Sequence, residues 1–183
     1  MDRLLDRLGA GPYDALGPAE RVLAAIVVAT LVVFVLAVAF AIVVVLLIWL
    51  EFRAIRPTLL AMLPTVGGLV WGLGALGWAG VVLDLFSVFA VLMFLGIGVD
   101  YGIHLLHPTL APRGASMSES LSLVGPAMLL AGATTIVGFG TLVLSSYAPL
   151  RSLGLTSVAT LAAALVAALV VLPAVVHGAE REA

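Results

Sequence analysis

Residues Val22–Leu50 read VLAAIVVATLVVFVLAVAFAIVVVLLIWL, with no charged residue and with Thr30 as the single polar one. A helix rises about 1.5 Å per residue, so this stretch is long enough to cross a hydrocarbon core of ~30 Å. The rest of the chain is similarly apolar: 63% of its 183 residues are hydrophobic and 10% are charged. Because soluble domains carry about 25% charged residues, the composition excludes a soluble fold and predicts an integral membrane protein.

The gaps between charged residues predict four more membrane spans after the first. We expect an all-α fold, a polytopic bundle of about five transmembrane helices, with spans at about 22–50, 57–80, 85–107, 120–147 and 152–177. Residues 1–19 are expected to form an extramembrane or interfacial segment, 20–178 the transmembrane domain and 179–183 a C-terminal tail.

Charge and cysteine content narrow the function classes. Eight arginines, no lysine and a net charge of −2 leave no basic patch, so nucleic acid is not an expected partner. The absence of cysteine excludes disulfides and thiol catalysis, and no cofactor or metal is expected. A multi-pass protein of the cell (inner) membrane is predicted, and the arginines nearest the span ends favour a cytoplasmic C-terminus.

Helix starts and helix packing leave recognisable patterns. Asp84 is expected to cap a helix, and Ser116 with Glu119 has the spacing of a capping box. Small residues allow helices to approach closely within lipid. The glycines expected to serve this role are Gly67, Gly68, Gly72 and Gly74 in the second span and Gly132, Gly138 and Gly140 in the fourth.

Asp100 is the residue that most needs a functional explanation, because it lies inside the third span. A carboxylate at the centre of a transmembrane helix costs about 2.5–3.5 kcal/mol on insertion scales. At about 100° per residue, Gly96, His104 and His107 lie within about 40° of Asp100, whereas Gly98 and Gly102 lie opposite it. One face therefore carries the polar groups, flanked by Tyr101, and the other is suited to close helix packing.

The same residues allow other interpretations. A buried hydrogen bond from Asp100 could simply fix helix packing, and Thr134 and Thr135 could bond back to their own helix. An aspartyl protease would need a second facing aspartate, for which only Asp84 is a candidate. A metal site built from Asp100, His104 and His107 finds no clear further ligand on another span.

The segment LFSVFAVLMFLGIGVDYGIHLLH, residues 85–107, resembles the fourth helix of a half-transporter of the resistance-nodulation-division (RND) superfamily. Its nearest likeness is to the MMPL and hydrophobe/amphiphile efflux-3 branch, which includes lipid exporters. Two further segments resemble the same family: FRAIRPTLLAMLP, at 52–64, and GPAMLLAGATTIVGFGTLVLSSYAPLRSLG, at 125–154. The resemblance covers about residues 20–177.

This resemblance implies a secondary active transporter, not an enzyme, in which protons drive export of lipids or other hydrophobic molecules. It implies that Asp100 carries the proton, that Tyr101 is its hydrogen-bonding partner and that Thr134 and Thr135 are relay groups. His104 and His107 could assist from the same face. The expected partners are protons, a membrane lipid or hydrophobic substrate, and either a second copy of the chain or a second RND-like half.

The resemblance also leaves alternatives. The family's large extracytoplasmic porter domain is not in this sequence, and residues 1–19 are expected to be its remnant or an interfacial helix. The same five helices resemble a sterol-sensing unit, which binds lipid without pumping. An inactive, truncated half-transporter is the third interpretation.

Overall fold

The computed structural model describes residues 17–111 and 114–182, and these residues are helical with no β-strand. Most of the expected N-terminal segment therefore lies outside the described residues. The elements are α2 (Pro18–Phe52), α3 (Ile55–Trp78), α4 (Leu85–Leu110), α5 (Met117–Val143), α6 (Ala148–Val166), the π-helical turn η1 (Ala167–Val171) and α7 (Leu172–Glu182).

Five stretches of the described chain are long and apolar enough to cross a membrane, which confirms the predicted helical membrane fold. The fifth stretch, Ala148–Gly178, is one helical run made of α6, η1 and the start of α7. Contacts divide the chain into a first unit ending at Ile42 and a second beginning at Val43. The first unit contains the start of α2, where Glu20 accepts a hydrogen bond from the amide of Gly17 at 3.0 Å.

Side-chain caps fix where two helices of the second unit begin. Asp84 accepts a hydrogen bond from the amide of Ser87 at the start of α4, and Ser116 forms a capping box with Glu119 at the start of α5. Both predicted caps are confirmed. Helix α3 ends at a left-handed glycine, Gly80 with φ +70°, whose amide bonds to the carbonyl of Gly77. A residue with a Cβ would be strained in that conformation.

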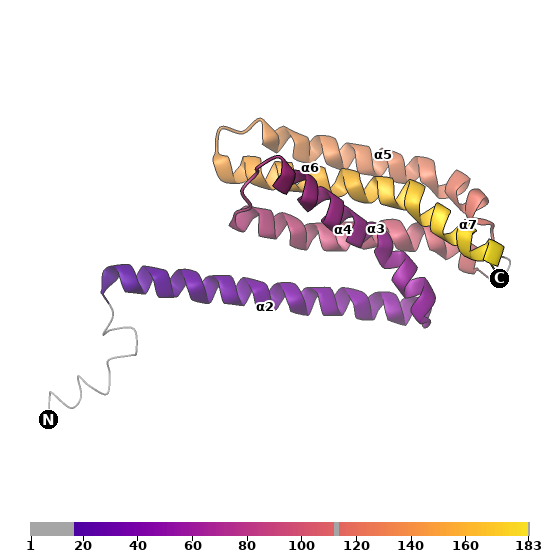
Figure 1. The fold of residues 1–183 in the computed structure, drawn as a ribbon, viewed down its shortest axis with the longest axis horizontal. Helices are drawn as coiled ribbons and strands as arrows, with labels where there is room; N and C mark the ends of the chain where they lie inside the picture. The colour runs from indigo at the N-terminus through magenta and orange to yellow at the C-terminus, as the bar shows by residue number, and fades with distance from the viewer. Residues whose placement is uncertain (1–16, 112–113, 183) are drawn as a thin grey trace, which may run out of the picture. The chain divides into compact units, whose positions relative to one another are not determined.

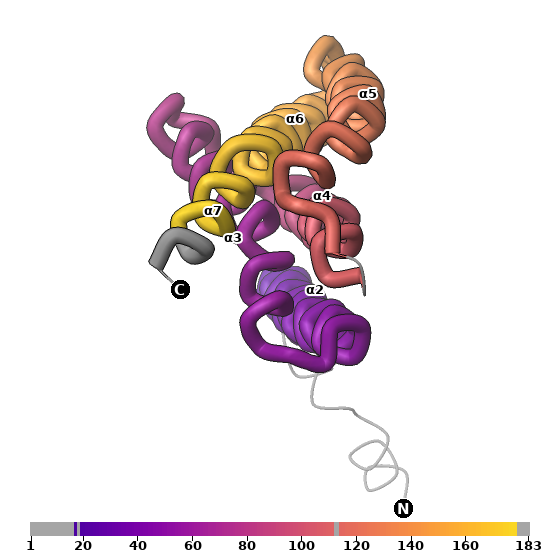
Figure 2. Tube along the Cα trace, turned by 90° about the vertical axis from the view of Figure 1, so that its right-hand side faces the viewer, coloured from indigo at the N-terminus to yellow at the C-terminus, as the bar shows by residue number. Residues whose placement is uncertain are grey.

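Within the second unit, α6 packs against α3, α4 and α5 and supplies the centre of the bundle (Figures 1 and 2). The fully buried Phe94 of α4 and Leu161 of α6 belong to its hydrophobic core. The approach of α3 to α6 depends on glycine: a Cβ at Gly72 would lie 2.6 Å from the Cα of Thr160. Absence of a side chain therefore brings the two backbones together.

Not every glycine expected to pack does so. A Cβ added at Gly74, Gly138 or Gly140 would meet no atom of the described chain within 4 Å, whereas one at Gly67, Gly68 or Gly132 would meet a neighbouring helix. The prediction was wrong for the first three because a glycine-rich helix still turns only one of its faces to its neighbours.

Candidate functional site

Helix α4 separates a polar outer face from a packed inner face. Asp100, His104 and His107 are exposed and Gly96 is half-buried, while Tyr101 on the flank is buried. The opposite face meets α3: a Cβ at Gly98 would lie 3.0 Å from Thr65 Oγ1, and one at Gly102 would collide with the backbone of Ala61. The structure thus brings Asp100 to the outside of α4, with α3 packed behind it.

A cavity of about 370 Å³ opens beside Asp100 between α4 and α5. Its polar lining residues are Asp100, Tyr101, His104 and Thr135. The α5 wall otherwise consists of the small or apolar side chains of Val124, Ala127, Met128 and Ala131, and Ile97 completes the α4 side. The cavity is therefore mostly apolar, with one carboxylate and three polar groups, which is typical of a site that binds a small molecule.

Tyr101 lies between α4, α5 and α6 and is 6% exposed. A Cβ at Gly132 of α5 would lie 3.0 Å from the Tyr101 hydroxyl oxygen and 3.0 Å from Leu165 of α6. Gly132 therefore provides the space that the tyrosine occupies. The buried side chain at the edge of the cavity is thereby held against α5.

The two threonines of α5 are not equivalent. The hydroxyls of Thr134 and Thr135 both donate to the carbonyl of Ala131, at 2.9 and 2.8 Å. Only Thr135 lines the cavity with Asp100, and the exposed Thr134 is not part of that lining. The structure therefore brings one of the two proposed relay threonines to the site.

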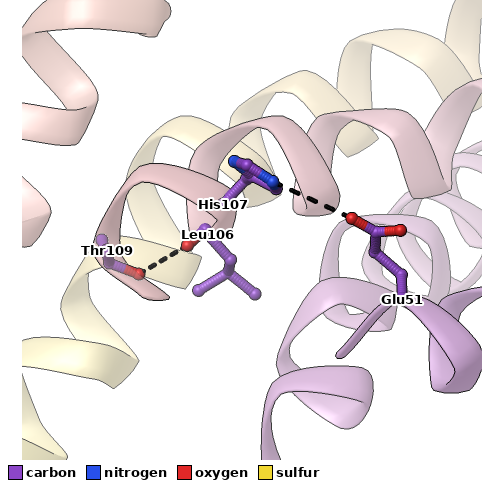
Figure 3. Close-up of polar contacts among 4 residues, drawn as sticks. All are labelled: Glu51, Leu106, His107 and Thr109. Carbon is purple, nitrogen blue, oxygen red and sulfur yellow. Dashed lines mark hydrogen bonds and ion pairs between the residues drawn. The ribbon is translucent and has the colours of Figure 1, made fainter. Parts of the chain in front are cut away.

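The two histidines of α4 are also separated. His104 lines the cavity, whereas His107 points to the end of α2, with its Nε2 3.8 Å from Glu51 Oε1 (Figure 3). Beside it, the hydroxyl of Thr109 donates to the carbonyl of Leu106 at 2.7 Å (Figure 3). Among the described residues, no three histidine, aspartate or glutamate side chains gather in a way that could hold a metal ion.

Asp84 takes part in a polar contact that sequence reasoning did not find. Its Oδ1 accepts hydrogen bonds from the Ser87 amide at 2.9 Å and from the Ser152 hydroxyl of α6 at 3.0 Å, and the Ser87 and Ser152 hydroxyl oxygens are 2.7 Å apart. Burial alone would raise the pKa of the Asp84 carboxyl, but these hydrogen bonds outweigh it and hold that pKa below its usual value. The carboxylate fastens the start of α4 to α6.

The only sign of this contact in the sequence is a regular spacing of hydroxyl residues in the last span. Ser152, Thr156 and Thr160 recur every four residues and so share one face of α6. All three are buried in the structure. The sequence alone did not indicate which helix this face would meet.

The chain has a distant relative among known proteins. The chain is 31% identical over 136 residues to the putative membrane protein MJ1562 of Methanocaldococcus jannaschii, a match that covers 71% of this chain and 35% of the archaeal protein. The chain therefore spans about a third of the length of that relative. No family model and no solved structure matches the chain. The five apolar helices and the similarity to a protein described as a membrane protein lead to the same conclusion. The chain is a multi-pass membrane protein.

Proposed function

We propose that the chain is the membrane domain of a proton-coupled exporter of the RND/MMPL type, acting on lipids or other hydrophobic molecules. In this proposal it is a secondary active transporter and not an enzyme, and it needs no cofactor. It would reside in the cell (inner) membrane with its C-terminus in the cytoplasm.

The observation that carries the proposal is the position of Asp100. It lies within the span Leu85–Leu110 and lines the cavity between α4 and α5. Ionisable residues at membrane depth are costly and mark ion or proton pathways. When a proton binds, the carboxylate loses its charge and the cost of facing an apolar environment falls, so proton binding can favour one arrangement of α4 and α5 over another.

The other cavity residues would support this exchange. Tyr101 would serve as the hydrogen-bonding partner of Asp100, and its hydroxyl lies toward Gly132 on α5. Thr135 would relay the proton across the cavity, where its hydroxyl can exchange the Ala131 carbonyl for water. Thr134 is the weaker relay candidate because it does not line the cavity, and His104 is better placed than His107 to assist.

The exposed face of α4 indicates what a complete transporter would contain. Phe89, Met93, Asp100 and His104 lie on this face and are exposed. A charged face of this kind is unfavourable in contact with lipid tails. We therefore propose that a second copy of the chain, or a second RND-like half, covers it and brings two α4 helices together.

The test of proton coupling is the variant Asp100→Asn, which keeps the shape of the side chain but cannot carry a proton on and off. The chain has no cysteine, so spin labels can be placed at Val70→Cys on α3 and Val137→Cys on α5, both at exposed positions. When the pH of the protein in lipid nanodiscs is lowered, we expect the label-to-label distance distribution to shift in the parent protein. The shift should vanish in Asp100→Asn and persist in the control Glu51→Gln, whose carboxylate is exposed outside the cavity.

A pH-dependent shift that survives in Asp100→Asn would refute the proton-carrying role. The partner is tested separately with Met93→Cys, which should form an intermolecular disulfide under mild oxidation. Val137→Cys, exposed on α5, serves as the matched control and should not. If Met93→Cys and Val137→Cys cross-link equally, the disulfides form by random collision and the exposed face of α4 is not the interface.

A second candidate, a lipid-binding module without transport, is favoured by a groove on α3. Trp71, Met62, Val66, Gly67 and their neighbours line a cavity of about 490 Å³ closed by Ala167 and Val171 of the π-helical turn. The lining residues have no charged side chain, so an acyl chain or a sterol is the fitting ligand. If the module only binds lipid, a photoactivatable acyl lipid should label this groove equally in the parent protein and in Asp100→Asn. The substitution should then leave the function of the module unchanged.

A further inference from the structure

The apolar groove on α3 begins close to the link between α2 and α3. Its α3 wall extends from Leu59 to Trp71, a rise of about 18 Å along the helix. This is slightly more than half the thickness of a hydrocarbon core of ~30 Å, and half of that thickness is the share of one leaflet. The α3 groove therefore has the length of a single acyl chain that enters from one side of the membrane.

The α3 groove is closed on the protein side and open on the other side. A Cβ at Gly67 would lie 3.0 Å from the Cβ of Ala167 in the π-helical turn, so α3 and the turn meet closely at the floor of the groove. By contrast, the side chains of Leu59, Val66 and Val70 are each more than half exposed. A lipid can therefore reach the groove sideways from the bilayer.

A positively charged residue precedes the groove on the same face of α3. At about 100° per residue, Leu63, Gly67 and Val70 of the groove lie within about 40° of Arg56. Arg56 is exposed and comes three residues before Leu59, where the groove begins. Because the Cα–Cβ bonds of a helix tilt toward its N-terminus, that of Arg56 tilts away from the groove and toward the membrane surface. The charge thus lies at the end of the groove where a lipid headgroup would be.

This charge has no acidic partner in the part of the chain that the structure describes. No ion pair joins Arg56, or the exposed Arg53 in the α2–α3 link, to an acidic residue there. The nearest acidic residue in sequence, Glu51, contacts His107 instead. The N-cap residue of α3, Ala54, makes no side-chain hydrogen bond, and the first turn contains no acidic residue. The positive end of the helix dipole therefore adds to the charge of the arginines.

We propose that the α3 groove binds one acyl chain of a membrane phospholipid of net negative charge, whose phosphate group is held by Arg56. Arg53 supplies a second positive charge beside the start of α3. Guanidinium groups bind phosphate oxygens through two parallel hydrogen bonds, so two arginines suffice for one lipid although they are too few for nucleic acid. A sterol, whose polar group is a neutral hydroxyl, would gain little from them. The inference rests on the lipid-binding candidate above and specifies its ligand.

Photolabelling of the full chain in neutral nanodiscs tests this ligand. The probes are phosphatidylglycerol and phosphatidylcholine with a diazirine at the same position of the same acyl chain, and a photoactivatable sterol. Labels are located along the chain by mass spectrometry. We expect phosphatidylglycerol to label residues 59–71 about fivefold more than phosphatidylcholine does, which is the effect of one arginine near an anionic group.

Two pairs of variants show where the preference arises. Arg56→Gln should remove most of it, whereas Arg151→Gln, the same loss of charge at an exposed position in the first turn of α6, should keep it. Val66→Trp places a large ring in the groove and should reduce labelling by both phospholipids. Val137→Trp, at an exposed position of α5 outside the groove, should not.

The inference is overturned if the two phospholipids label the groove equally, if the sterol labels it more strongly, or if the preference survives in Arg53→Gln/Arg56→Gln. It is also overturned if labelling persists in Val66→Trp, and should that variant fail to fold, the arginine variants still decide. Equal labelling by the two phospholipids would leave the lipid-binding candidate intact. No label in the groove from any probe would mean that protein covers it, and both ideas would fail. None of these readouts depends on Asp100, so the exporter proposal is tested separately.

Discussion

Gly102 of α4 lies directly against the backbone of Ala61 in α3, so closely that a Cβ at position 102 would overlap the Ala61 carbonyl group. Gly98, one turn earlier, lies against Thr65 less closely: a Cβ there would be 3.0 Å from Thr65 Oγ1 and 3.2 Å from Thr65 Cα. These two contacts hold the inner face of α4 on α3 and thereby direct Asp100 outward, toward α5. The orientation of the candidate site depends on two residues that have no side chains.

Gly102→Ala should therefore be strongly destabilising. The added methyl group collides with backbone atoms, which cannot move aside as a flexible side chain can, and overpacking of this kind costs about 1–3 kcal/mol or more. Gly74→Ala is the matched control on α3, since a Cβ there meets no described atom within 4 Å. It should be neutral or stabilising by up to about 1 kcal/mol, because alanine favours helix more than glycine does. Unfolding in mixed detergent micelles measures both, and equal effects would refute the packing argument.

The sequence was sufficient to place Asp100, because the rotation of a helix by about 100° per residue separates its faces before any partner is known. The same rotation explains why Thr134 and Thr135, adjacent in sequence, cannot both point into one cavity. The rotation alone could not predict that the side chain of His107 would point toward Glu51 and not into the cavity. A side chain near a helix end can reach a neighbouring helix, and the sequence does not say which helix that is.

The contacts of α6 could not be predicted from local patterns. Ser152 meets Asp84 across 68 residues of sequence, and this pairing is fixed only when α6 packs beside α4. The π-helical turn at Ala167–Val171 was missed for a related reason. Its sequence, AALVV, is ordinary helix sequence, and no local signal distinguishes it.

The contact between His107 and Glu51 is expected to contribute little to stability. The two side chains are 67% and 53% exposed, and their nearest polar atoms are 3.8 Å apart. Exposed ion pairs are typically worth about 0–1 kcal/mol. A double-mutant cycle with His107→Ala and Glu51→Gln should give a coupling energy in that range, and a value well above it would mean that the pair is shielded in the assembled protein.

Tyr101→Phe should distinguish the packing role of the Tyr101 ring from the role of its hydroxyl in proton coupling. The ring keeps its place in the hydrophobic core, so the free energy of unfolding should change by less than about 1.5 kcal/mol. If the hydroxyl is the hydrogen-bonding partner of Asp100, the pH midpoint of the distance shift between labels at positions 70 and 137 should move. Tyr147→Phe, at an exposed position before α6, is the control and should leave that midpoint unchanged. An unchanged midpoint in both variants would remove Tyr101 from the relay.

Asp84 should give the protein a stability that depends on acid pH. Its pKa is lower in the folded state than the ordinary value of 3.8, because the hydrogen bonds from Ser87 and Ser152 stabilise the charged form. Its stabilising contribution is therefore complete above about pH 4–5 and is lost as the pH falls through the folded-state pKa.

Two substitutions of Asp84 distinguish its role as a helix cap from the effect of its charge. Asp84→Ala should lower the free energy of unfolding by about 0.5–2 kcal/mol at pH 7, the usual cost of losing an N-cap. Asp84→Asn can still accept the hydrogen bond from the Ser87 amide, but it does not titrate. The difference in unfolding free energy between the parent protein and Asp84→Asn should therefore be constant from pH 7 to 5. Below pH 4 the parent protein should lose stability relative to Asp84→Asn.

Denaturation curves measured across this pH range provide the check. A difference that stays constant down to pH 2.5 would mean that the Asp84 carboxylate has the same pKa in the folded and unfolded chains, and that its contact with Ser152 contributes no charge-dependent stability.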